Sequence, residues 1–215
     1  MSLEQAPRVA ALEILGERLC LDFVNTVDPR IGPRQQDYLA SFADLVNWDV
    51  RAGLLTDEEA YVTLSAAAQE SDRAEALFRR AIFLRETLYR IFIAVAERHV
   101  PSSEDLVALH DAYAEVVTSA HLVATPDGIV WRWPAASDAL EKMLAPIIRS
   151  AVELLISPEA QRMKVCPGLG DCGWLFLDAS KSGRRRWCSM RSCGSRAKMR
   201  RYYARTHASA HSDHE

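Results

Sequence analysis

The chain has 215 residues, 49 % of them hydrophobic, and a formal net charge of −3, which are values typical of a folded globular protein. No apolar run approaches the roughly 18 residues of a membrane span. The opening MSLEQAPRVAALEIL also lacks the basic and apolar segments of a secretory signal. We therefore expect a cytoplasmic protein, in a compartment where disulfide bonds are rare.

Charge divides the chain into two unequal parts. Residues 1–165 carry 16 Lys+Arg and 25 Asp+Glu, a net charge of −9, whereas residues 166–215 carry 10 and 4, a net charge of +6. The contrast favours a helical regulatory domain over residues 1–160, a metal-stapled domain over residues 161–207 and a polar tail over residues 208–215. A metal is expected in the second part because about fifty residues bury too little apolar surface to fold unaided.

The apolar pattern of the first part predicts mainly helices. Apolar residues at three- and four-residue steps indicate a helix over residues 38–50. Gly53 ends that helix, and Thr56 with Glu59 forms a capping box for the next one. A long helix is expected over residues 71–99, with its apolar positions facing inward.

A further helix is expected beyond Pro101, where Ser102 or Ser103 supplies the cap. Its apolar positions are Leu106, Leu109, Tyr113 and Val117.

One stretch near residues 120–134, HLVATPDGIVWRWP, alternates apolar and polar residues around a Pro-Asp-Gly turn. This pattern predicts a β-hairpin. Trp131 and Trp133 share one face of its second strand and are expected to cover the core. A last helix is predicted over residues 137–155, so the fold class is mainly α with a small β-hairpin.

Four cysteines form the most specific pattern in the chain. They lie in two pairs, CPGLGDC and CSMRSC, at Cys166, Cys172, Cys188 and Cys193. Two turns that each offer two thiolates build a closed, structural Zn²⁺ site. Gly173 and Gly194, which follow the two pairs, allow the backbone to turn tightly beside the metal. The fifth cysteine, Cys20, lies in an apolar run and is expected to be a small buried hydrophobe.

The segment CGWLFLDASKSGRRRWCSMRSCGSRAKMRRYYAR resembles the C-terminal zinc finger of the CGNR family. The similarity extends beyond the cysteines to GWLF at 173–176, RRWCSM at 185–190 and RAK at 196–198. LCLDFVNTV, followed by Arg30, resembles the opening of the helical ABATE domain that accompanies this finger. The resemblance implies a bacterial, stress-induced transcription regulator with a treble-clef-like or ribbon-like zinc finger.

The chain departs from that family at the motif that names it. The sequence reads CGSR, with Ser195 where the family has asparagine. A serine hydroxyl can still cap the following helix, but it cannot offer both the donors and the acceptor of an amide. If the asparagine contacts DNA, base preference differs here.

The finger also carries the charge and the apolar residues that its metal requires. Four thiolates around Zn²⁺ leave a formal charge of −2, which the arginines nearest in sequence are expected to offset. These are Arg184, Arg185, Arg186 and Arg191. The residues expected to form a small core over the zinc, rather than to stack on bases, are Trp174, Leu175, Phe176 and Trp187. Asp178 is expected to hold a turn or to pair with a nearby arginine.

The segment after Cys193, SRAKMRRYYARTH, is predicted to be a basic helix. Met199, Tyr202 and Tyr203 share one face at three- and four-residue spacing, and basic residues cover most of the rest. Such a helix fits a phosphate backbone or a major groove. The predicted nucleic-acid contacts are Arg184, Arg185, Arg186, Arg191, Arg196, Lys198, Arg200 and Arg201. The alternative interpretation is a solvated basic helix.

The acidic first part is unsuited to nucleic acid on charge alone, so we expect it to form a homodimer, to sense a small-molecule effector, or both. Asp22, Asn25 and Arg30 are polar residues near a dense apolar segment. All three are candidates to line a ligand pocket, and the alternative is that Asp22 and Asn25 cap or brace the fold.

The leading hypothesis is a DNA-binding transcription regulator. The alternative is a zinc-stabilised module that binds an acidic protein or RNA without sequence-specific DNA binding. No enzyme is expected, because the chain has no glycine-rich phosphate loop, HExxH or GxSxG motif, and four cysteines leave the zinc no open position.

Overall fold

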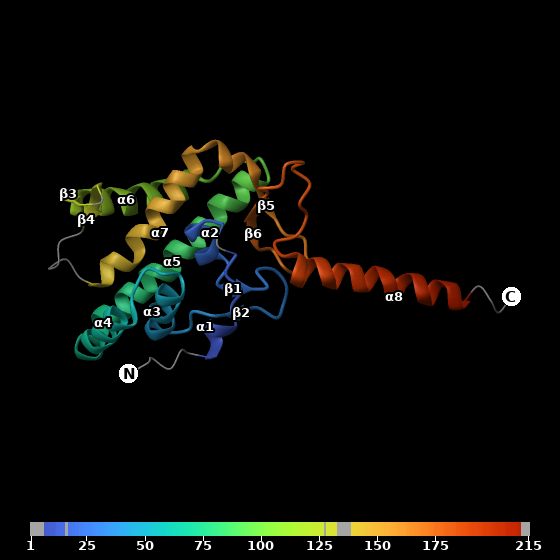
Figure 1. The fold of residues 1–215 in the computed structure, drawn as a ribbon, viewed down its shortest axis with the longest axis horizontal. Helices are drawn as coiled ribbons and strands as arrows, with labels where there is room; N and C mark the ends of the chain where they lie inside the picture. The colour runs from blue at the N-terminus through green and yellow to red at the C-terminus, as the bar shows by residue number, and fades with distance from the viewer. Residues whose placement is uncertain (1–6, 16, 127, 133–138, 212–215) are drawn as a thin grey trace.

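The computed structural model describes residues 7–15, 17–126, 128–132 and 139–211 (Figure 1). Its helices in the first part of the chain are α1 Pro7–Ala11, α2 Leu19–Val24, α3 Phe42–Arg51, α4 Asp57–Gln69, α5 Ser71–Ala96, α6 Ser103–Ser119 and α7 Ala139–Ile156. The long helix α5 is their common support, because α2, α3, α4, α6 and α7 all contact it. The mainly helical fold class predicted from the sequence is confirmed.

Local sequence signals set several of the helix ends. The Thr56 hydroxyl accepts from the Glu59 backbone N–H at 3.2 Å, and the Glu59 carboxylate accepts from the Thr56 N–H at 2.9 Å. Both bonds of the predicted capping box at the start of α4 are therefore present. Ser102 caps α6 by accepting from the Asp105 N–H at 3.0 Å. Gly53, just after α3, has the positive φ of 75° that glycine tolerates.

The apolar positions named for α6 differ in their burial. Leu109 and Val116 are buried, whereas Leu106 and Val117 are 42 % and 43 % exposed, and Tyr113 is half-buried.

Among the described residues, three two-stranded antiparallel sheets accompany the helices. β1 Val27–Asp28 pairs with β2 Gln36–Asp37, β3 His121–Thr125 with β4 Gly128–Arg132, and β5 Met163–Val165 with β6 Leu175–Leu177. The β3–β4 pair is the predicted hairpin, with Thr125 opposite Gly128. The predicted packing of Trp131 and Trp133 lies outside the described side chains, as do Asp127 and the predicted start of the last helix at Ser137.

The C-terminal segment continues the core of the helical part instead of forming a separate one. A short 3₁₀ turn, η1 Pro158–Arg162, leads from α7 into β5, which contacts α5. The four paired cysteines, Trp174, Leu175 and Phe176 belong to the same buried cluster as the helical residues. Trp187 is half-buried at its edge, so three of the four predicted cover residues are fully buried.

The last helix, α8 Ser195–His211, projects away from the rest of the molecule (Figure 1). It follows η2 Met190–Gly194, a π-helical turn that it contacts at its base. α8 extends into the segment that was predicted to be a polar tail. In the part of the chain that the structure describes, none of the helices combines the length and apolar character needed to cross a bilayer.

Cys20 lies in α2 and is fully buried, as predicted. Burial raises the pKa of its thiol to about 12, despite a contact with Ser150. The thiol therefore stays protonated and unreactive at neutral pH.

Asp49, in α3, is a buried acid with unusual surroundings. Its side chain is 0 % exposed, and neither carboxylate oxygen has a hydrogen-bond partner among the described residues. Burial holds the pKa of Asp49 well above its ordinary value. The native state therefore favours the protonated acid, and its stability falls as pH rises above about 4, where Asp49 ionises in the unfolded chain.

Replacing Asp49 by asparagine removes this penalty. We expect Asp49→Asn to unfold at higher denaturant than the wild type at pH 7, with the difference shrinking towards pH 4 by up to about 1.4 kcal/mol per pH unit. Urea titrations of both proteins at pH values of about 4.5, 5.5, 6.5 and 7.5 measure this difference in unfolding free energy. A difference in unfolding free energy that does not vary with pH would contradict the assignment.

Candidate metal centre and nucleic-acid interface

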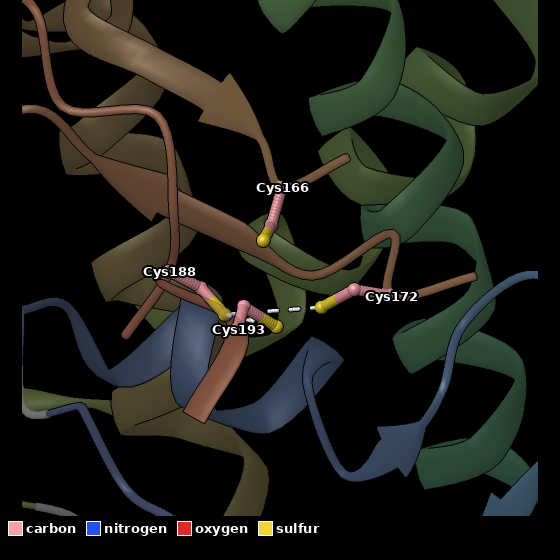
Figure 2. A group of neighbouring side chains, drawn as sticks. All are labelled: Cys166, Cys172, Cys188 and Cys193. Atoms are coloured by element: carbon pink, nitrogen blue, oxygen red, sulfur yellow. Dashed lines mark hydrogen bonds between the residues drawn. The ribbon is translucent and has the colours of Figure 1, made fainter. Parts of the chain in front are cut away.

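The four paired cysteines meet at one point (Figure 2). Their sulfur atoms all lie within 4.8 Å of one another, and all four residues are buried. The Cys172 and Cys188 sulfurs are 3.8 Å apart, as are those of Cys188 and Cys193. A tetrahedral Zn²⁺ site with bonds of about 2.3 Å requires sulfurs about 3.8 Å apart, whereas a disulfide requires about 2.05 Å. The donor set and its size therefore fit a structural zinc.

The backbone around each pair explains how the sulfurs converge. The Cys166 N–H donates to the Trp174 carbonyl at 2.7 Å, and the Gly173 N–H donates to the Cys166 carbonyl at 3.0 Å, which closes the first turn. Gly173 has a φ of 69°, and a Cβ there would lie 2.9 Å from the Cβ of Arg30. A Cβ at Gly194 would lie 2.9 Å from the Met190 sulfur. Gly173 is therefore required by its backbone conformation and by the contact with Arg30, whereas at Gly194 the neighbouring atom belongs to the flexible, exposed side chain of Met190.

The arginine that touches a thiolate is Arg196, not one of the four named from the sequence. Its guanidinium donates to the Cys193 sulfur at 3.1 Å. The positive charge of this guanidinium stabilises the Cys193 sulfur in its thiolate form. Arg196 is the second residue of α8, so the helix base and the metal centre share a charge-assisted contact.

Arg185 also forms its contacts inside the protein instead of being free to bind a ligand at the surface. Its guanidinium donates to the Trp187 carbonyl at 2.9 Å and to the Leu177 carbonyl at 3.1 Å, and pairs with Glu17. A further bond reaches the carbonyl of Cys188. All three guanidinium nitrogens of Arg185 are thereby engaged inside the protein.

Asp178 organises the loop between the two cysteine pairs. Its carboxylate accepts from the Lys164 ammonium at 2.5 Å, from the Arg185 N–H at 3.0 Å and from the Ser180 N–H at 3.1 Å. The Lys164 ammonium, followed by the hydroxyl and N–H of Ser180, holds the pKa of Asp178 well below its ordinary value. The predicted turn role is present, and the ion-pair partner is a lysine.

Asn25 joins the metal-binding segment to the helical part. Its side-chain amide donates to the Leu175 carbonyl at 2.8 Å, and its carbonyl oxygen accepts from the Leu175 N–H at 3.0 Å. The Trp174 indole N–H donates to the Val27 carbonyl at 2.8 Å. The side chain of Asn25 therefore acts as one further pairing position on the open edge of β6.

A second contact fixes the first cysteine turn against α5. The Arg30 N–H donates to the Cys172 carbonyl at 2.6 Å. The Arg30 guanidinium lies over the Tyr89 ring and pairs with Glu86 at 2.7 Å. The Tyr89 hydroxyl donates to the Gly173 carbonyl at 3.0 Å. Two loops distant in sequence are thus held to one face of α5.

Asp22, Asn25 and Arg30, named as candidate ligand contacts, all have partners inside the protein. The Asp22 carboxylate accepts from the Leu15 N–H at 2.9 Å. These contacts match the bracing interpretation, and a ligand-binding role for the three residues stays a prediction.

Further contacts across the same boundary come from two glutamates that the sequence analysis did not identify. Glu17 accepts from the Leu177 N–H at 2.7 Å, and Glu13 accepts from the Ser189 hydroxyl at 2.9 Å. No sequence signal identifies them, because each partner lies more than 150 residues away along the chain.

The remaining predicted nucleic-acid contacts form an exposed basic surface on the finger and α8. Its members are Arg184, Arg186, Arg191, Arg196, Lys198, Arg200 and Arg201. Between Trp187 and α8 lies a groove of about 310 Å³. Arg186, Arg200 and Arg201 flank its apolar floor.

Ser195, the residue that departs from the family motif, is exposed at the start of α8. Its hydroxyl donates to the Met190 carbonyl at 3.0 Å and so braces η2 instead of capping the helix.

Two family models match the chain. Residues 17–158 match the ABATE family, described as "Putative stress-induced transcription regulator", and residues 162–206 match the CGNR zinc finger. No curated protein matches the chain.

Removing one thiolate tests the metal centre. We expect Cys172→Ser and Cys188→Ser each to lose the single zinc per chain, because a structural site supplies about 10–16 kcal/mol of folding free energy only with all ligands present. The helical part has core contacts of its own, so most helicity remains, but its unfolding midpoint falls because Asn25 loses its partner strand. Metal analysis and circular dichroism measure both effects.

The matched control is Cys20→Ala, which removes a buried cysteine outside the metal centre and should keep one zinc per chain. Full zinc content in either serine variant would remove that residue from the ligand set.

Asn25→Ala tests the attachment of the finger to the helical part. The substitution leaves the buried N–H and C=O of Leu175 without partners, so we expect a loss of about 2–4 kcal/mol in unfolding free energy with zinc retained. Asn47→Ala, which removes a single side-chain bond to Ala43 on α3, should change stability by less than about 0.5 kcal/mol. Equal effects of the two substitutions, measured by urea unfolding, would show that Asn25 does not attach the finger to the helical part.

Proposed function

The chain belongs to the ABATE family, and from that premise we propose that it is a cytoplasmic, DNA-binding transcription regulator whose zinc finger contacts DNA through α8. The observation that carries the proposal is the projecting basic helix, whose base is fixed by the metal centre.

The dimensions of α8 suit a DNA groove. Its 17 residues give a rod about 25 Å long, and a major groove about 12 Å wide accepts such a helix. The base of α8 contacts η2, which carries Cys193, so zinc binding sets the direction in which the helix points. A pre-oriented helix loses less entropy on binding than a free one.

The charge of this surface matches a polyanion. Ten Lys+Arg and no acidic residue lie between Lys181 and Arg205. Of these, Arg185 is engaged internally, and we leave it out of the proposed contact surface. We assign the DNA contacts to Arg184, Arg186, Arg191, Lys198, Arg200 and Arg201, with Arg196 shared between the thiolate and the phosphate backbone.

We propose that the acidic helical part is the region of the regulator that senses a signal or forms a dimer. Its net negative charge disfavours a second contact with DNA. We assign no catalytic role to the zinc, because four thiolates fill its coordination sphere.

A titration of the zinc-loaded protein onto its own upstream DNA, against random duplex competitor, tests the proposal. Preferential binding of the upstream duplex supports a sequence-specific regulator. Absence of binding to any duplex overturns the proposal and directs α8 to an acidic protein or RNA.

Substituting the arginines that flank the groove beside Trp187 tests the proposed contact surface most directly. We expect Arg200→Ala with Arg201→Ala to weaken DNA binding, because each lost phosphate contact removes about 0.9 from the slope of log affinity against log salt. Zinc content should not change, since neither residue contacts a cysteine. Fluorescence anisotropy over a salt series measures the slope.

Arg79→Ala is the control for that pair. Arg79 is an exposed arginine on α5, remote from the finger, and its removal should leave the slope unchanged. If the double variant kept the wild-type affinity and slope, α8 would not be the contact surface.

A further inference from the structure

A groove of about 340 Å³ lies between α5 and α6, away from the metal centre. The two helices run antiparallel here, because Arg80 pairs with Glu115 and Arg90 pairs with Asp105 at 2.5 Å. The first of these ion pairs belongs to the lining of the groove, whereas Arg90 and Asp105 lie outside the lining.

Small residues on α6 create the hollow. The lining positions follow one helical face on each side, at residues 80, 83, 84 and 87 of α5 and 108, 111, 112 and 115 of α6. At two of the α6 positions stand Ala108 and Ala112, which are too short to fill the space opposite Phe83 and Leu84. Ile148 of α7 contributes to the lining from a third helix.

The groove is lined mainly by apolar side chains, and its charged lining residues carry a net negative charge. Phe83 stays 61 % exposed at its edge, an unusual position for a phenylalanine. The charged lining residues are Arg80, Asp111 and Glu115. Arg80 is paired with Glu115, whereas Asp111 has no ion-pair partner among the described residues. A bound molecule therefore meets apolar walls and one uncompensated carboxylate.

We propose that this groove binds a small organic cation, an aryl- or alkyl-ammonium compound whose apolar part enters between Phe83 and Ala112 and whose charge pairs with Asp111. The volume lies at the small end of the roughly 300–1,000 Å³ of ligand sites. The inference rests on the proposed role of the helical part as the signal-sensing region of a regulator, and it specifies the chemical class of that signal.

The position of the groove connects it to the finger through one helix. Leu84 and Thr87 line the groove, while Glu86 and Tyr89 on the same stretch of α5 hold Arg30 and Gly173. A ligand that shifts this stretch of α5 acts on the residues that fix the first cysteine turn.

Binding of three probes to the zinc-loaded full-length protein tests the proposal. Phenethylamine is a cation at neutral pH, phenethyl alcohol is its neutral counterpart, and phenylacetate is an anion of similar size. We expect calorimetry and saturation-transfer NMR to show the amine binding roughly three- to fivefold more tightly than the alcohol, the effect of one exposed ion pair, with phenylacetate weakest.

Two kinds of variant separate the charge from the cavity. Asp111→Asn should abolish the preference for the amine over the alcohol while leaving zinc content and the unfolding midpoint unchanged. Glu75→Gln, which neutralises an exposed carboxylate on α5 outside the groove, should keep the preference. Ala112→Leu fills the groove and should abolish binding of all three probes, and Ala108→Leu serves if the first variant does not fold.

Equal affinities for the amine and the alcohol in the wild type would overturn the proposal, as would unchanged binding in a folded groove-filling variant. None of these measurements contains DNA. A protein that binds the amine but no DNA duplex would refute the proposed regulator function and support the cation site. A protein that binds a duplex but not the amine would support the regulator function and refute the cation site.

Discussion

The orientation of α8 depends on a series of fixed contacts that runs from the zinc thiolates to Asn25. α8 contacts the rest of the fold at its base, through η2 and the bond from Arg196 to the Cys193 sulfur. The cysteine turns are in turn tied to the helical part by the two bonds between Asn25 and Leu175. Each contact is weak alone, but together they place a metal-bound turn, a strand and a helix in one rigid relation.

α5 is the element on which these constraints meet. One face packs against α2, α3 and α7 in the core, and another carries Glu86 and Tyr89, which hold the first cysteine turn through Arg30 and Gly173. A third lines the groove opposite α6. Buried elements of this kind transmit displacement because close-packed interiors do not deform gradually. The same helix therefore supports the finger and forms a wall of the proposed ligand site.

The features predicted well from the sequence are those encoded over a few residues. The capping box of Thr56 and Glu59, the pairing of β3 with β4 and the two cysteine pairs each depend on positions close together in the sequence. The partners of Asn25 and Glu17 lie 150 and 160 residues away along the chain, and no local pattern marks them. Burial along α6 is also not given by local spacing, since Leu109 is buried and Leu106 is exposed on a helix whose neighbours are α5 and α7.

The arginines show most clearly why composition alone overstates a binding surface. Arg185 and Arg186 are adjacent in sequence and identical in charge, yet Arg185 is bound to three backbone carbonyls and Glu17, whereas Arg186 is exposed beside Trp187. The loop needs one such guanidinium, since carbonyl groups turned inward near the metal require donors, and the other is left to meet a ligand. A basic segment on a small metal-stapled fold therefore supplies both its own scaffold and its contact surface, and Arg185, whose three guanidinium nitrogens are all engaged inside the protein, belongs to the scaffold.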